Sequence, residues 1–118
     1  MEKKKLLIAE DTESNYFYLS ILLREKYDIR WAKNGAEAVD MHKEQKADII
    51  LLDIKMPVKD GLLALQEIRA TDKDTPIIMQ TAYAFDQDMS NAMKLGASAY
   101  LTKPILKEML FKTLNKFE

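Results

Sequence analysis

Chemically reactive side chains follow short apolar runs at several places in this chain. Glu10 and Asp11 follow the first such run, Asp53 the third, Thr81 the fourth and Lys103 the fifth. Carboxylates that are held together repel one another unless a cation lies between them, and oxygen ligands without His or Cys nearby favour Mg²⁺. Because protein-bound Mg²⁺ commonly joins one or two carboxylates to a phosphate, these residue types predict a site for a phosphoryl group.

The other side chains of this predicted site suit phosphoryl chemistry. The ammonium of Lys103 can serve as a point charge for one phosphoryl oxygen, and the hydroxyl of Thr81 can donate a hydrogen bond to another. A carboxylate that does not hold the metal can act as a nucleophile and form an acyl phosphate.

The apolar runs before these residues predict five strands. Most of the runs lack the alternation of polar and apolar residues that a half-exposed strand shows, which favours strands buried on both faces of a parallel sheet. We therefore expect five buried strands, at about residues 6–9, 29–32, 49–52, 77–79 and 99–101.

Segments with helical periodicity separate the predicted strands. Asn34 can cap the second helix while Glu37 reaches back toward it, and Asp60 can cap the third. Gly96 suits a left-handed helix end, and Pro104 suits a first helical turn. The predicted helices cover about residues 13–26, a segment from 34 through 41, 61–69, 86–95 and a segment after 104.

This alternation of strand and helix predicts a single doubly wound α/β domain over residues 1–118. Connections between parallel strands are right-handed and place helices on both faces of the sheet. Ligands of such sheets bind outside the carboxyl ends of the strands, where the reactive side chains are expected to lie together.

Composition excludes several other classes of protein. The 118 residues carry a net charge of −1, which argues against direct binding of nucleic acid. The chain has no Cys, so it forms no disulfide. Its longest uncharged stretch, residues 75–85, is about half of the ~20 residues that a membrane span needs, and no signal sequence is evident. We expect a cytoplasmic protein that does not insert into membranes.

Four motifs resemble those of the receiver domain of two-component response regulators. They are the segments 9–11, 51–61, 80–82 and 96–104, and the resemblance spans essentially the whole chain. Segments 10–16 and 80–84 are more similar to receivers fused to hybrid sensor histidine kinases than to receivers fused to DNA-binding domains. The resemblance implies a flavodoxin-like (βα)5 fold with strand order 2-1-3-4-5. Both a stand-alone receiver and a part of a longer protein remain open.

The resemblance also implies roles for the acidic residues. Asp53 would accept a phosphoryl group from a phosphohistidine on a sensor histidine kinase or a histidine phosphotransfer domain. Mg²⁺ would be held by Asp11, by Asp53 and by the main-chain carbonyl of Lys55. Many receivers have Asp where this chain has the longer Glu10, so Glu10 could bind the metal directly or through a water molecule.

The resemblance also implies roles for residues that contact the phosphoryl group or take part in the conformational switch. Lys103 would contact the phosphoryl group, Thr81 would move toward it, and Tyr100 would follow Thr81 as the switch aromatic. Lys55 and Tyr83 would shape the access of water to the acyl phosphate. The peptide bond between Lys103 and Pro104 is expected to be cis.

The resemblance implies a signalling switch that catalyses its own phosphorylation and dephosphorylation and is not otherwise an enzyme. Its output face would consist of the fourth helix, the fifth strand and the last helix, with Tyr83, Phe85, Met89 and Ile105 on it. This face would contact a downstream effector protein or domain, and it could also form a homodimer.

Two alternatives come from other classes. A haloacid-dehalogenase-like phosphohydrolase would also use an Asp nucleophile, but it requires a second Asp at the position of Lys55. A flavodoxin-like or degenerate-receiver binding module is disfavoured because no phosphate loop rich in Ser and Thr follows Ile8 and the acidic site is intact.

For two further side chains, the sequence predicts a structural place and no functional role. His42 lies beside Lys43 and Glu44 in a predicted helix, so we expect a solvent-exposed histidine. Trp31 lies in the second predicted strand, where we expect it to contribute to packing.

Overall fold

The computed structural model of the chain describes residues 3–82 and 87–118. Strands and helices alternate along it, as the sequence predicts. The elements are β1 (Lys4–Ala9), α1 (Glu13–Leu23), β2 (Tyr27–Ala32), α2 (Gly35–Glu44), β3 (Ile49–Asp53), α3 (Gly61–Thr71), β4 (Ile77–Thr81), α4 (Gln87–Lys94), β5 (Ala99–Thr102) and α5 (Lys107–Asn115).

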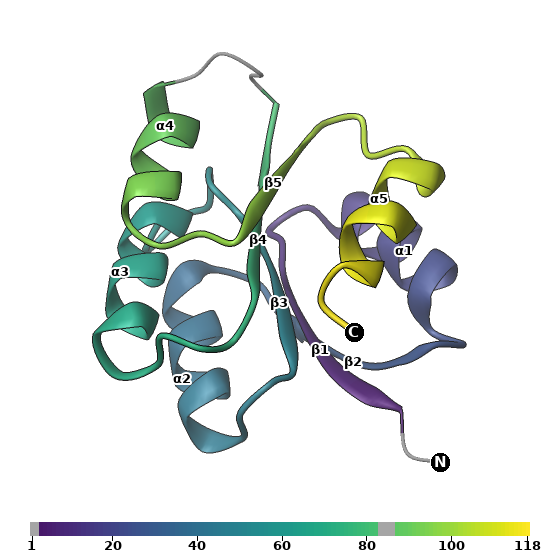
Figure 1. Cartoon of the computed structure of the whole chain (residues 1–118), viewed down its shortest axis with the longest axis horizontal. Helices are drawn as coiled ribbons and strands as arrows, with labels where there is room; N and C mark the ends of the chain where they lie inside the picture. The colour runs from purple at the N-terminus through teal and green to yellow at the C-terminus, as the bar shows by residue number, and fades with distance from the viewer. Residues whose placement is uncertain (1–2, 83–86) are drawn as a thin grey trace.

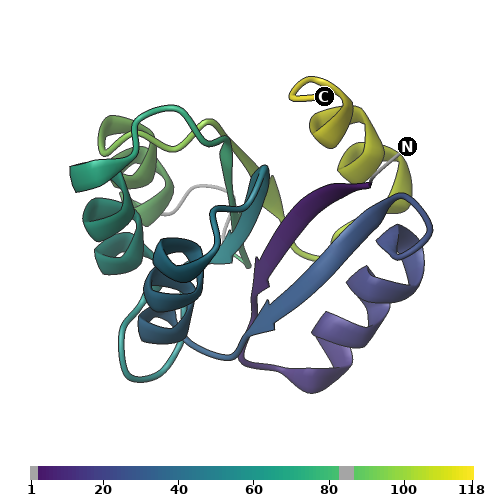
Figure 2. The ribbon, with the colours of Figure 1, turned by 90° about the horizontal axis from the view of Figure 1, so that it is seen from below.

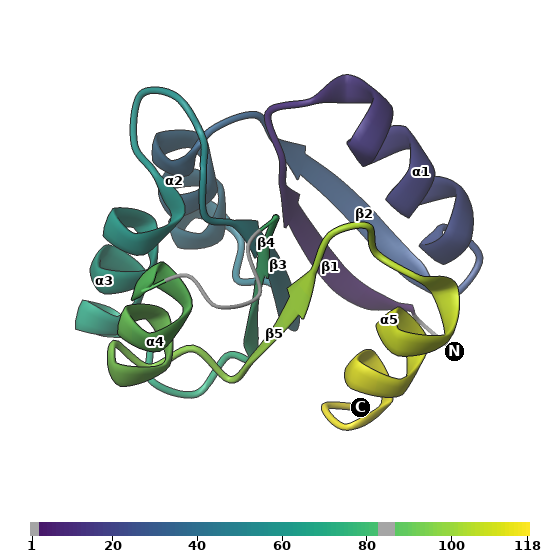
Figure 3. The same ribbon diagram turned by 90° about the horizontal axis from the view of Figure 1, so that it is seen from above.

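The strands form one parallel sheet in the order β2-β1-β3-β4-β5, which confirms the predicted topology. Helices α1 and α5 cover one face of the sheet, and α2, α3 and α4 cover the other (Figure 1). The views from below and from above show the sheet between these two helical layers (Figures 2 and 3).

Each central strand has a continuous run of apolar residues because each face of the sheet needs its own core. In β1, Leu6 and Ile8 pack toward α1 and α5, whereas Leu7 and Ala9 pack toward α2 and α3. The residues of β3 alternate in the same way. Two separate apolar cores therefore hold the sheet in place, as continuous apolar runs require.

The expectation of five buried strands is wrong for the two edges of the sheet. In β2 only the first and last residues are buried, and in β5 only Leu101 is buried. An edge strand has a neighbour on one side only, and fewer helices cover it. The outer strands consequently carry half-exposed residues such as Trp31 and exposed ones such as Tyr100.

The predicted caps are present at the ends of the helices. The side chain of Asn34 accepts a hydrogen bond from the Glu37 main chain, and Asp60 accepts one from the Leu63 main chain. Gly96 has a φ of 109°, the left-handed conformation predicted for the end of α4.

Several helix boundaries differ from the prediction, and two of the differences bear on the packing of the helices. Helix α1 ends at Leu23 instead of 26, and α5 begins at Lys107 instead of directly after Pro104. Leu106 has extended dihedrals at the start of α5, and the preceding Ile105 is buried against the α1 and α5 core. Because the side chain of Ile105 is buried in the core, the chain stays extended here and the helix begins later than predicted.

The prediction for His42 is wrong, because this histidine is buried with 6% of its surface exposed. It lies on the same face of α2 as Ala38 and Val39, which pack against the sheet. Its Nε2 lies 2.8 Å from Asp72 Oδ2, and its Nδ1 accepts a hydrogen bond from the Ala47 main chain. The charged neighbours Lys43 and Glu44 face solvent on the other side of the helix.

The helices of the described residues are too short or too polar to cross a lipid bilayer.

Candidate functional site

The residues predicted to react lie at the carboxyl ends of the strands. Glu10 directly follows β1, Asp53 ends β3, Thr81 ends β4, and Lys103 directly follows β5. The main-chain N–H of Glu10 donates to the Ala32 carbonyl, and that of Lys103 donates to the Thr81 carbonyl. The sheet hydrogen bonding thus continues into the residues of the site and fixes their main chain.

The ammonium of Lys103 joins two of the carboxylates. Its Nζ lies 2.8 Å from Asp53 Oδ2 and 3.2 Å from Glu10 Oε1. These contacts bring together residues that are 50 and 93 positions apart in the sequence. The structure therefore gathers Glu10, Asp53 and Lys103 in one cluster at the carboxyl edge of the sheet.

Asp11 completes a group of three acidic side chains. One carboxylate oxygen from each of Glu10, Asp11 and Asp53 lies within 4.8 Å of the others. Glu10 and Asp53 are buried, whereas Asp11 is exposed at the mouth of the site. Solvent and solutes can therefore reach the cluster from the side of Asp11.

The electrostatics of the pocket favour a protonated Glu10 when no cation is present. Burial and the neighbouring Asp53 carboxylate raise the pKa of Glu10 from its ordinary 4.5 to about 8. Burial alone would lower the pKa of Lys103, but Asp53 and Glu10 raise it above its ordinary value. One ammonium and one carboxylate then balance each other, and the second buried carboxyl keeps its proton.

The donor set fits a hard divalent cation. Glu10 is fully buried, and one of its carboxylate oxygens belongs to the cluster. Together with Asp11 and Asp53 it presents only oxygen atoms, which suit Mg²⁺ better than zinc or copper. An added double positive charge would replace the proton of Glu10.

The loop after β3 fixes the orientation of Asp53. The Lys55 main-chain N–H lies 3.3 Å from Asp53 Oδ1, and the Gly61 main-chain N–H donates to the Ile54 carbonyl. A Cβ at Gly61 would lie 2.2 Å from the Asp53 carbonyl oxygen, so only glycine permits this close approach of α3. The helix and the end of β3 are therefore held against each other.

Lys55 links this loop to α4. Its Nζ lies 2.6 Å from Asp88 Oδ2 in the first turn of α4. Tyr83, which is expected to act with Lys55 on the access of water, lies outside the described residues, as does Phe85.

The two expected switch residues occupy different environments. Thr81 is 1% exposed and lies one residue beyond the strand partner of Asp53 in β4. Tyr100 is 47% exposed in β5, where it pairs with Met79. The peptide bond between Lys103 and Pro104 is cis, as expected.

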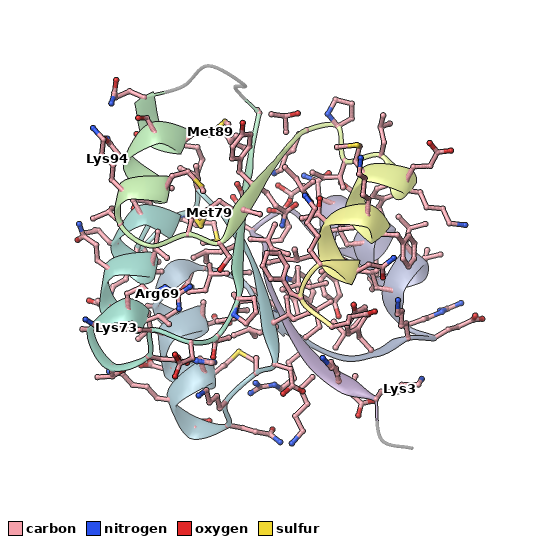
Figure 4. The ribbon with its side chains drawn as sticks, in the orientation of Figure 1. Lys3, Arg69, Lys73, Met79, Met89 and Lys94 are labelled. Atoms are coloured by element: carbon pink, nitrogen blue, oxygen red, sulfur yellow. The ribbon has the colours of Figure 1, made fainter. Side chains whose placement is uncertain are left out.

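Two residues expected on the output face are not at the surface. Met89 is 6% exposed and packs in the core between the sheet and α4, near Met79 (Figure 4). Ile105 is 8% exposed and belongs to the other core. Met89 lies on α4 and Ile105 lies between β5 and α5, but both apolar side chains turn inward to cover the sheet. The exposed apolar residues of this face are Tyr100, Met93, Leu106 and Met109.

Three residues near the site have surroundings that the sequence did not predict. The indole N–H of Trp31 donates to the Glu10 carbonyl at 2.8 Å. Asp88 pairs with Lys55, and Gln80 is buried beside the end of β4 with its side-chain nitrogen unpartnered among the described residues. In β4 the polar Gln80 follows three apolar residues, and this change of residue type was the one sign in the sequence that Gln80 could have a role of its own.

Comparisons with known proteins agree with this geometry. A family model described as the response regulator receiver domain matches residues 6–115. The chain is 37% identical to the chemotaxis protein CheY of Halobacterium salinarum over 113 residues, which cover 95% of this chain and 94% of that protein. It is also 37% identical to hybrid signal transduction histidine kinase I of Dictyostelium discoideum over 125 residues, 98% of this chain but 7% of that protein.

A solved structure shows the same fold. It is the receiver domain of a sensor histidine kinase from Pseudomonas aeruginosa, with a magnesium ion coordinated in its active-site cleft. The two chains share 33% identity with a TM-score of 0.91, and the alignment covers 98% of this chain and 97% of the other.

Proposed function

Since this chain belongs to the response regulator receiver domain family, we propose that Asp53 accepts a phosphoryl group from a phosphohistidine of a sensor histidine kinase or histidine phosphotransfer domain. The observation that carries this proposal is the contact of the Lys103 ammonium with Asp53 beside two further carboxylates. A carboxylate with this surrounding is oriented by its neighbours and has a cation within reach of an incoming phosphoryl oxygen.

The proposed transfer is a substitution at phosphorus. An oxygen of Asp53 forms the new P–O bond while the P–N bond to the donor imidazole breaks, and the electron pair of that bond stays on the imidazole nitrogen. Lys103 bears part of the negative charge on the phosphoryl oxygens, and the Lys55 main-chain N–H holds the carboxylate in place.

Glu10, Asp11, Asp53 and the carbonyl of Lys55 would hold Mg²⁺. Bound there, the ion would neutralise charge on the phosphoryl oxygens. The place of a Glu10 oxygen in the cluster supports a contact of Glu10 with the cation, directly or through a water molecule.

The phosphorylated state differs from the resting state by roughly two negative charges at Asp53. We propose that Thr81 donates a hydrogen bond to the phosphoryl group and that Tyr100 changes its packing in response. Tyr100 is exposed here beside Met109, with which it lines a cavity of about 160 Å³ at the α4, β5 and α5 face. This face would contact the downstream effector or form a homodimer.

The remaining proposals concern the protein as a whole. Residues 1–118 would form one receiver domain that acts in the cytoplasm, catalyses its own phosphorylation and dephosphorylation, and turns over no separate substrate. The phosphohydrolase alternative requires a carboxylate at position 55, where the chain has a lysine that pairs with Asp88.

Intact mass tests the proposal. The protein is incubated with Mg²⁺ and a small phosphodonor, either acetyl phosphate or phosphoramidate. Wild type and the control variant Asp28→Asn, whose side chain is exposed on β2, should each gain one phosphoryl group, whereas Asp53→Asn should gain none. Equal addition to Asp53→Asn, or no addition to wild type, would overturn the assignment.

A further inference from the structure

The main chain of Glu10 is held at both of its polar groups by the end of β2. Its N–H donates to the Ala32 carbonyl at 2.9 Å, and its carbonyl accepts from the indole N–H of Trp31 at 2.8 Å. This carbonyl belongs to the peptide unit that joins Glu10 to Asp11. One side-chain hydrogen bond therefore holds the planar unit between two acids of the cluster.

The indole takes the place of a main-chain donor at this point of the sheet. Strand β2 ends at Ala32, because the chain then turns toward α2, which Asn34 caps. A parallel ladder that continued would offer the Glu10 carbonyl a main-chain donor from the neighbouring strand. The side chain of Trp31 supplies that donor instead.

Contacts with α1 and with the segment before α2 fix the orientation of the indole. The ring of Tyr16 on α1 stacks on it, with centroids 4.2 Å apart and planes 4° from parallel. The Lys33 ammonium lies over the indole, 5.0 Å from the ring centroid. A ring that is held in this way loses little further freedom when its N–H bonds to a carbonyl. Trp31 thus joins the end of β1 to α1, on either side of the short segment that carries Asp11.

Two of the three acids in the cluster depend on this segment. Glu10 is fully buried, and one oxygen of its carboxylate lies within 4.8 Å of one oxygen each from Asp11 and Asp53. Carboxylates this close repel one another until a cation arrives, so their main chain needs an anchor that the cluster does not itself provide. A ligand set that is already in place binds a cation more tightly than one that must be ordered on binding.

We propose that Trp31 is a positioning residue of the Mg²⁺ site, whose indole N–H holds the peptide unit between Glu10 and Asp11 so that both carboxylates are in place before the cation binds. The inference rests on the proposed function, because the site that Trp31 serves is the one proposed for Mg²⁺. In this role Trp31 touches neither the cation nor the phosphoryl group. Loss of its N–H should weaken Mg²⁺ binding and leave the chemistry at Asp53 intact.

The sharpest test removes the indole N–H alone. Benzothienylalanine has a sulfur atom in place of the indole N–H and nearly the same shape, and stop-codon suppression can introduce it in place of Trp31. Calorimetric titration with Mg²⁺ at constant ionic strength then compares this analogue protein with wild type. We expect its affinity to be about fivefold weaker, the net worth of one hydrogen bond. Equal affinities would overturn the proposal.

Two standard variants accompany the analogue protein. Trp31→Phe keeps an aromatic ring beside Tyr16 but has no donor, and it should also weaken Mg²⁺ binding by about fivefold or more. Tyr27→Phe is the matched control, because it removes one side-chain hydrogen bond, to Glu118, at the opposite end of the same strand. This control should bind Mg²⁺ as wild type does. Unchanged affinity in Trp31→Phe, or an equal loss in Tyr27→Phe, would contradict a specific role of Trp31.

The rate of phosphorylation distinguishes positioning from a merely structural role. With acetyl phosphate as the donor, the Mg²⁺ concentration that gives half of the maximal rate should rise about fivefold in the analogue protein, whereas the rate at saturating Mg²⁺ should equal that of wild type. A defect in folding alone would lower the saturated rate and leave the half-saturating concentration unchanged. That pattern would count against the proposal.

The calorimetric result is independent of phosphoryl transfer. If wild type binds Mg²⁺ but gains no phosphoryl group, the proposed function fails, and the Mg²⁺ affinity of the analogue protein still decides the role of Trp31. If wild type gains a phosphoryl group and the analogue protein binds Mg²⁺ equally well, only the role of Trp31 fails. If wild type binds no Mg²⁺, the metal site and the role of Trp31 are both wrong.

Discussion

The indole N–H of Trp31 donates to the main-chain carbonyl of Glu10, 2.8 Å away. Trp31 also stacks on Tyr16, with ring centroids 4.2 Å apart and planes 4° from parallel. It is the one tryptophan of the sequence. A change in the position of Glu10 is thus transmitted by one hydrogen bond to the main fluorophore of the protein.

The first prediction uses this contact to measure cation binding. Adding Mg²⁺ should change the fluorescence of Trp31 in a saturable manner, because the cation alters the charge around Glu10. Asp11→Asn should weaken the apparent affinity for Mg²⁺ by at least about tenfold, since it removes one charged ligand of the cluster. Asp28→Asn, a control on β2, should titrate as wild type does, and an unchanged affinity in Asp11→Asn would contradict the proposed metal site.

The second prediction concerns pH. The folded chain binds the proton of Glu10 more tightly than the unfolded chain, because the pKa of Glu10 is raised from 4.5 to about 8. This contribution to stability is fully present below about pH 4.5 and is lost as the pH rises through 8. Glu10→Gln removes the titrating group, so in metal-free buffer its melting temperature should exceed that of wild type most at pH 9.

The advantage of Glu10→Gln over wild type should shrink as the pH falls from 9 toward 5. Thermal unfolding at a series of pH values measures this difference. The control Glu44→Gln, an exposed residue at the end of α2, should show no such dependence. A constant difference between Glu10→Gln and wild type would contradict the raised pKa of Glu10.

The third prediction concerns the buried histidine. Because Nδ1 of His42 accepts a hydrogen bond from Ala47, its Nε2 donates to Asp72. Hydrogen bonds from Thr75, from His42 and from the main chain outweigh burial and hold the pKa of Asp72 well below its usual range. His42→Ala should therefore lower the free energy of unfolding by about 3 kcal/mol, as for other losses of buried hydrogen bonds and packing.

Urea denaturation measures this loss, and phosphorylation serves as the comparison. Ala47 precedes β3 and Asp72 precedes β4, so His42 lies at the edge of the sheet opposite to Asp53. His42→Ala should accept the phosphoryl group as wild type does at temperatures where it is folded. A large loss of phosphorylation in the folded variant would indicate a role for His42 beyond stability.

The fourth prediction concerns the loop between Asp53 and α3. Val58 has a φ of 68° and is 85% exposed, so a β-branched residue takes a left-handed conformation without any packing in return. Val58→Asn should raise the free energy of unfolding by about 1 kcal/mol, because Asn tolerates this conformation. Val58→Ile, which keeps the branched Cβ, should leave stability unchanged, and equal stabilities of all three proteins would argue against strain at this position.

Local patterns in the sequence were sufficient to predict the fold and much of the site. Apolar runs without alternation indicate strands with two covered faces, and their order with the helices leaves few topologies. Glu10, Asp53, Thr81 and Lys103 could be placed together because parallel strands end at the same edge of the sheet. The edges were missed although β2 carries a signal in its own sequence: Asp28 and Arg30 alternate with apolar residues there, as in a half-exposed strand, whereas the central strand β3 has four apolar residues in a row.

The amino-acid sequence by itself determined the five strand and helix units, the helix caps at Asn34 and Asp60, and the residue types at the strand ends. Only the tertiary structure decided that Glu10 is buried with a raised pKa, that His42 faces Asp72, and that the indole of Trp31 reaches the Glu10 carbonyl. The physical reason is the range of the interactions. Periodicity and capping act within a few residues of the chain, whereas burial, ion pairing and long-range hydrogen bonds depend on which distant segments the packed sheet and helices bring into contact.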